Sequence, residues 1–176
     1  MLKYAALLLQ NFFLITCLKR KPQDLPASDL FLVFVVFLYL VAGCIHNSLH
    51  DSMYRSLLIG GLDILLMFFF VYLFLKLLNH SNRWTQTILA LAGSGLILTL
   101  FAIPVSIGLI RTQGNPAYPL FAFLLLFLFI WSISVHAHIF RHAFTLSFGS
   151  GVAIALFYNL ISFMIISSMI QTQGNI

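Results

Sequence analysis

The stretch Arg83–Ile110, RWTQTILALAGSGLILTLFAIPVSIGLI, decides the fold of this chain. Trp84 is an amphipathic ring suited to a membrane headgroup boundary, and no charged residue follows it in the rest of the stretch. Pro104 lacks the amide that would bond back to the carbonyl of Leu100, so we expect a bend there. The sequence therefore predicts a central, kinked membrane helix at about 87–110.

Small side chains recur at four-residue steps in this helix and in the last apolar segment of the chain. They are Ala90 and Ser94 in the first, and Ser147, Gly151 and Ala155 in the second. Steps of four place them on one face of a helix, where a neighbouring helix can approach closely. We predict that these residues are helix-packing positions.

The composition excludes a soluble globular protein. Of the 176 residues, 61% are hydrophobic and only 7% are charged, which is more apolar surface than a soluble domain of this size can bury. The net charge of +5 comes from basic residues at expected helix ends, so it does not indicate a nucleic-acid partner. The lipid bilayer is the expected partner of a single membrane domain covering residues 1–176.

Hydropathy predicts four further spans on either side of the central helix. The expected fold is all-α, an integral membrane bundle of five transmembrane helices at about 30–45, 57–78, 87–110, 119–139 and 144–170. The turn between the last two spans is expected to be minimal, at 140–143.

Residues 1–21 are expected to form an amphipathic helix in the membrane interface. The apolar part covers only about 15 residues, whereas a bilayer core needs ~20. A cleavable signal peptide carries its basic residues before the apolar run, but here Lys19, Arg20 and Lys21 follow it. The alternative is a sixth span, which would move the N-terminus to the opposite side.

Basic residues indicate the orientation of the five spans. The side that holds the N-terminus collects Lys3, Lys19, Arg20, Lys21, Lys76, Arg83 and Arg141, whereas the other side collects only Arg55 and Arg111. Basic residues are retained on the cytoplasmic side. We therefore expect a cytoplasmic N-terminus and an external C-terminus.

Asp63 is the only acid inside a predicted span, about six residues or ~9 Å from its outer end. Its expected partners inside the membrane are Ser106 and Asn159, with Arg55 or Arg111 reaching in from the boundary. The structural interpretation is an interhelical hydrogen bond, and the functional one is a proton or cation site. For an isolated acid, the sequence favours the structural interpretation.

His138, Arg141 and His142 form a predicted interfacial cluster at the inner end of the fourth span. His138 and His142 have metal-compatible spacing, but only His80 could approach as a third ligand. Contacts with headgroup phosphates explain the cluster without a metal, so no metal site is predicted.

No catalytic or cofactor-binding pattern is present in the sequence. Walker, Rossmann and HExxH motifs are absent. A Ser/His/Asp arrangement would need Asp63 at the depth of His136 or His138. We expect these residues at different depths, because Asp63 is placed near the outer side and the histidines near the inner side. The sequence therefore predicts neither an enzyme nor a cofactor.

The architecture resembles bacterial members of the Yip (Ypt-interacting) membrane-protein family. The likeness lies in a short interfacial helix, the Pro-containing break Lys21-Pro22-Gln-Asp-Leu-Pro26, and five spans with two tight hairpins. The segments PQDLPAS at 22–28 and RWTQTILALAG at 83–93 also resemble small proteobacterial membrane proteins. The resemblance implies a polytopic scaffold of unknown activity. We expect the protein in a bacterial inner membrane, where the bias of basic residues places the C-terminus in the periplasm. GTPase binding is not carried over, because no long cytosolic N-terminal region is present.

Two functions from different classes remain open on the sequence. The leading hypothesis is a non-enzymatic scaffold or accessory subunit, whose partner is a second copy of the chain or another membrane protein. The alternative is a small transporter or channel, with a polar path along Asp63, Asn159 and the bend at Pro104. A transporter predicts polar residues from several spans around one cavity, whereas a scaffold predicts isolated, hydrogen-bonded ones.

Overall fold

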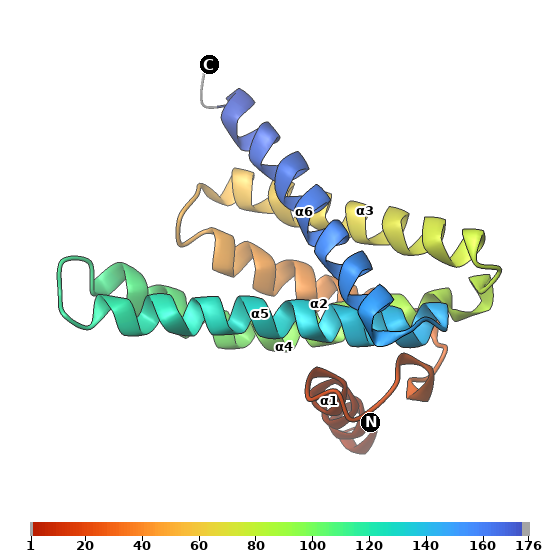
Figure 1. Cartoon of the computed structure of the whole chain (residues 1–176). Coiled ribbons are helices and arrows are strands. Elements are labelled where there is room, and N and C mark those ends of the chain that lie inside the picture. The colour runs from red at the N-terminus through yellow and green to blue at the C-terminus, as the bar shows by residue number, and fades with distance from the viewer. Residues whose placement is uncertain (1, 174–176) are drawn as a thin grey trace.

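The computed structural model describes the backbone of residues 2–173 and the side chains of residues 9–168, and this part of the chain is all-α. Its helices are α1 Leu2–Thr16, η1 Pro22–Asp24, α2 Asp29–Asn47, α3 Met53–Leu77, η2 Ser81–Arg83, α4 Trp84–Arg111, α5 Tyr118–Phe144 and α6 Phe148–Gln173 (Figure 1). Helices α2 to α6 are long and apolar enough to cross a membrane. The predicted bundle of five transmembrane helices is confirmed.

The bundle has two ends that differ in what they carry (Figure 1). We call the end with the linker 17–28 and the turns at 78–83 and 145–147 the inner end, and the end with the turns at 48–52 and 112–117 the outer end. Side chains such as Leu30, Phe123 and Phe163 are 80%, 66% and 70% exposed along the helices, as expected of lipid-facing positions.

Several helix boundaries differ from the predicted ones. Helix α3 begins four residues earlier than expected, because Ser52 caps it by accepting from the amide of Arg55 at 3.4 Å. The expected turn at 140–143 is wrong, since α5 continues to Phe144 and ends where Thr145 takes the left-handed conformation with φ 56°. Hydropathy placed the start of α3 too late and the end of α5 too early, because polar helix ends extend beyond the hydrocarbon layer.

Helix α4 lies at the centre of the bundle and contacts α1, α2, α3 and α5. Most of its buried residues lie between Thr87 and Leu98, in its inner half. Two glycines let aromatic rings sit against its backbone. A Cβ on Gly93 would lie 2.4 Å from the ring of Phe12, and one on Gly95 would lie 2.8 Å from the ring of Tyr39. The helix continues through Pro104 to Arg111.

Helix α1 lies across the bundle and is seen almost end-on in Figure 1, where α4 and α5 run lengthwise. Phe12 and Ile15 are buried, and the indole of Trp131 in α5 donates to the carbonyl of Thr16 at 2.9 Å. The helix ends at Thr16, so the expectation of a helix over all of 1–21 is wrong at its C-terminal end. Leu18 there adopts a left-handed conformation with φ 62°, and a residue in that conformation closes a helix.

Candidate functional site

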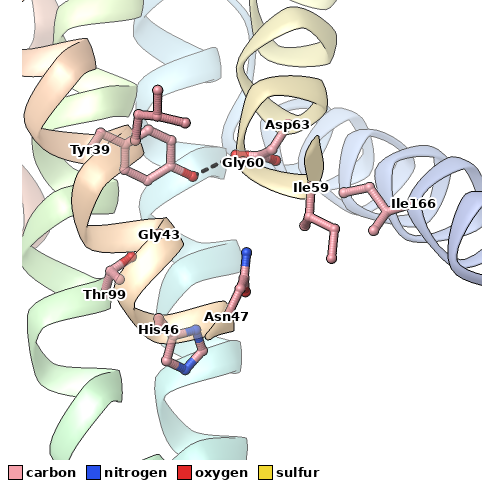
Figure 2. A pocket seen from close by; sticks show the side chains of 10 residues that line it. Tyr39, Gly43, His46, Asn47, Ile59, Gly60, Asp63, Thr99 and Ile166 are labelled. Atoms are coloured by element: carbon pink, nitrogen blue, oxygen red, sulfur yellow. Dashed lines mark hydrogen bonds between the residues drawn. The ribbon is translucent and has the colours of Figure 1, made fainter. Parts of the chain in front are cut away.

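The centre of the site is a hydrogen bond between α2 and α3. The hydroxyl of Tyr39 donates to the Asp63 carboxyl group, with 2.7 Å between Oη and Oδ2 (Figure 2). Gly60 lets the two helices approach at this level, because a Cβ there would lie only 3.0 Å from a methyl group of Leu40. Sequence analysis missed Tyr39 as a partner, although it carries the only hydroxyl group between residues 30 and 45.

Asp63 lies deeper than predicted. It follows Met53 by ten residues and precedes Leu77 by fourteen, which places it ~15 Å and ~21 Å from the two ends of α3. Within the described residues its carboxyl group receives a hydrogen bond from Tyr39 and has no basic partner. Arg55, one of its predicted partners, instead lies 3.9 Å from Asp51.

A cavity of about 250 Å³ opens on the outer side of the Tyr39–Asp63 pair (Figure 2). His46 and Asn47, at the outer end of α2, line it together with Thr99 of α4. Ile166 of α6 forms part of the opposite wall. The outer cavity therefore joins polar groups at the membrane boundary to the carboxyl group in the middle of the bundle.

A second cavity of about 210 Å³ lies against the same pair and also touches Thr99. Helices α5 and α6 supply its other polar groups, namely Ser132, His136, Tyr158, Asn159 and Ser162. Asn159 donates to Nδ1 of His136 at 3.3 Å and to the carbonyl of Ala155 at 2.8 Å. Polar residues from all five spans thus surround two adjoining cavities, which we call the outer and inner cavities.

The expectation that Asp63 and His136 lie at separate depths is wrong. Both line the inner cavity, because Asp63 is deeper in α3 than predicted and α5 continues five residues beyond the expected end. They do not form a catalytic triad with Ser132. The hydroxyl of Ser132 donates to the carbonyl of Phe129 at 2.7 Å, His136 bonds to Asn159, and Asp63 bonds to Tyr39.

The structure separates Ser106 from the other two residues of the predicted polar site. Asp63 and Asn159 line one cavity, but the Ser106 hydroxyl lies 2.9 Å from Nε2 of His46 near the outer end. The prediction that Ser106 is a partner of Asp63 is therefore wrong. Ser106 is only five residues from the end of α4, so it is too close to the outer boundary to meet Asp63.

The small residues pack inside the chain. Ala90, Ser94 and Ala155 are fully buried, and a Cβ on Gly151 would lie 2.6 Å from the carbonyl oxygen of Ala137 in α5. Ser147 is the exception, because it lies before α6 and is exposed. Its hydroxyl accepts from the amide of Ser150 at 3.2 Å, so Ser147 caps the helix instead of packing against another one.

The predicted interfacial cluster holds the inner end together. The His138 ring donates to the carbonyl of Arg20 at 2.8 Å, and the carbonyl of His142 accepts from Gln23 at 2.6 Å. Arg141 packs beside Gly151, with its Cβ 3.0 Å from the position of an added methyl group. His80, the predicted third metal ligand, bonds to the Thr145 hydroxyl at 3.0 Å. Among the described side chains, no three His, Cys, Asp or Glu residues form a metal-binding group.

Comparison of the chain with protein-family models, curated proteins and solved structures gives no match. What the site can do follows from its own chemistry. A carboxyl group in the middle of a membrane needs a proton, a cation or a basic partner to balance its charge. The described residues provide no basic partner at Asp63. A proton or a cation can instead reach the carboxyl group through the two cavities.

Proposed function

We propose that this chain is a small transport protein that moves a cation across the membrane, with Asp63 as the binding carboxylate. The observation that carries the proposal is an Asp63 carboxyl group without a basic partner among the described residues, exposed to two adjoining polar cavities. Ionisable residues within membrane spans mark ion pathways by default. Tyr39 holds the carboxyl group in position for the cation.

The distribution of polar groups along the bundle supports a path and not a single buried bond. His46 and Asn47 lie at the outer end, Tyr39 and Asp63 in the middle, and His136 and Asn159 on the inner side. By contrast, the small-residue faces that suggested a self-associating scaffold are occupied by contacts within the chain. We therefore place the transport hypothesis before the scaffold hypothesis, and no chemical reaction is part of it.

A flux measurement tests the proposal. The purified protein is reconstituted in liposomes, and an inside-negative potential drives uptake of protons, ²²Na⁺ and ¹⁴C-tetramethylammonium. We expect uptake of at least one of these cations above protein-free liposomes, and loss of that uptake in Asp63→Asn. Asp51→Asn is the matched control, because Asp51 lies in the outer turn and does not line either cavity.

Two outcomes would contradict the proposal. In the first, none of the three cations enters faster than in protein-free liposomes. In the second, Asp63→Asn transports as well as the unchanged protein. Thermal melting of Asp63→Asn must accompany the flux assay, so that loss of transport is separated from loss of folding.

We further propose a Yip-like protein of a bacterial inner membrane, with its N-terminus in the cytoplasm and its C-terminus in the periplasm. The proposed orientation is supported by the excess of basic residues at the inner end, including Lys19, Arg20, Lys21 and Arg83. After Asn82, a reporter enzyme that works only in the cytoplasm should be active. After Ile176, a reporter enzyme that works only in the periplasm should be active. The reverse pattern would refute this orientation.

A further inference from the structure

An apolar groove of about 260 Å³ lies between α3 and α6. Its lining is mainly hydrocarbon, unlike that of the two polar cavities. Its walls are formed by side chains such as Leu66, Phe70, Leu73, Phe157 and Ile161. Leu73 and Phe157 are 39% and 52% exposed, so the groove is open at the bundle surface that faces lipid. It can hold hydrocarbon but offers little to a hydrated ion.

The groove adjoins the inner cavity. Tyr158 and Ser162 line both of them, and Asp63 lies on the other side of the inner cavity. A single molecule can therefore place one part beside the carboxyl group and another part in the groove.

Aromatic rings surround the junction between the inner cavity and the groove. The ring of Tyr158 lies 5.0 Å from that of Phe70 and 5.7 Å from that of His136, and the ring of Phe70 lies 6.3 Å from that of Phe157. The faces of aromatic rings attract cations, and more strongly where water is excluded. The junction thus favours a positive charge that is attached to an apolar body.

Resting on the transport function proposed above, we infer that the site takes amphipathic organic cations. The positive centre lies beside Asp63, between Tyr39 and Tyr158, and the hydrocarbon body occupies the groove between α3 and α6. Charge complementarity selects a cation at the carboxyl group, and the apolar walls select hydrocarbon next to it. The occupant can enter the groove sideways from the membrane.

Binding of tritiated tetraphenylphosphonium to the full chain in lipid nanodiscs tests the inference. We expect saturable binding that weakens at least tenfold in Asp63→Asn and about threefold or more in Phe157→Ala, which removes one aromatic wall of the groove. Phe163→Ala is the matched control on the same helix, because Phe163 is 70% exposed and does not line the groove.

The outcomes separate this inference from the transport proposal. If the unchanged protein transports tetramethylammonium, which has no hydrocarbon body, but shows no saturable tetraphenylphosphonium binding, the inference is wrong and the transport proposal stands. If tetraphenylphosphonium binds with the expected dependence on Asp63 and Phe157 but no cation is transported, the inference stands and the transport proposal is wrong. The inference is also wrong if Phe163→Ala weakens tetraphenylphosphonium binding as much as Phe157→Ala does.

Discussion

The inner and outer halves of the bundle are packed very differently. In the inner half, Val71, Leu75, Ile88 and Phe140 are at most 1% exposed. In the outer half, α6 leaves α5 and runs obliquely toward α3 (Figure 1). The outer cavity is lined there by residues of α2, α3, α4 and α6. A path through the membrane would therefore be accessible from the outer side and closed on the inner side in this conformation.

Polar contacts to backbone carbonyls hold the inner half closed. The guanidinium of Arg83 donates to the carbonyls of His142 and Ala143 at 3.3 and 3.1 Å. The side-chain amide of Gln86 donates to the carbonyls of Gln23 and Leu25 at 3.2 and 2.8 Å. These bonds join the linker, α4 and the end of α5, so opening of the inner side requires that they break or rearrange.

The largest expected effect comes from forcing the inner half apart at Gly151. A Cβ there would meet the backbone carbonyl of Ala137 at 2.6 Å, and a backbone atom cannot move aside as a side chain can. We expect Gly151→Leu to lower the free energy of unfolding by about 3 kcal/mol or more, measured by thermal melting in detergent. Gly149→Leu is the control, because nothing lies within 4 Å of an added Cβ at Gly149. Equal melting temperatures for the two variants would refute tight packing of α5 against α6.

A smaller effect is expected from removing one polar contact of the inner end. Arg83→Ala deletes two hydrogen bonds to carbonyls of α5, and because Arg83 is only half-buried we expect a loss of about 1–2 kcal/mol. Thermal melting of Arg83→Ala is compared with that of Arg111→Ala, an exposed arginine at the outer end. If the outer variant loses as much stability as the inner one, the two halves do not differ as proposed.

The fold was predictable because its signals are local. Runs of apolar residues such as those in 87–110 indicate spans directly, and the four-residue steps at Ala90, Ser94, Gly151 and Ala155 marked residues that are buried or in close contact. Helix ends were less predictable, because Ser52 and Thr145 set them through capping geometry and not through hydropathy.

The site was harder to predict, because it depends on the relative depth of residues in different helices. An error of four residues at the start of α3 shifts the inferred position of Asp63 by ~6 Å. That error was enough to place Asp63 near Ser106 and away from His136. In the structure, Asp63 lines a cavity together with His136, and Ser106 instead contacts His46. A single tyrosine in an apolar span, Tyr39, was the available signal for the true partner.

The smallest change in stability is expected from Tyr39→Phe, which acts where the two cavities meet. It removes the hydroxyl that donates to Asp63 and keeps the ring that packs against Gly95. Hydrogen bonds between membrane helices contribute little on average, so we expect a loss of only about 0.5–1 kcal/mol in thermal melting. Cation uptake should fall much more, because the carboxyl group loses the bond that orients it. Tyr72→Phe is the control, because Tyr72 is 52% exposed and lines neither cavity. If Tyr39→Phe keeps full uptake, the hydroxyl only joins α2 to α3, and the bond between Tyr39 and Asp63 is structural.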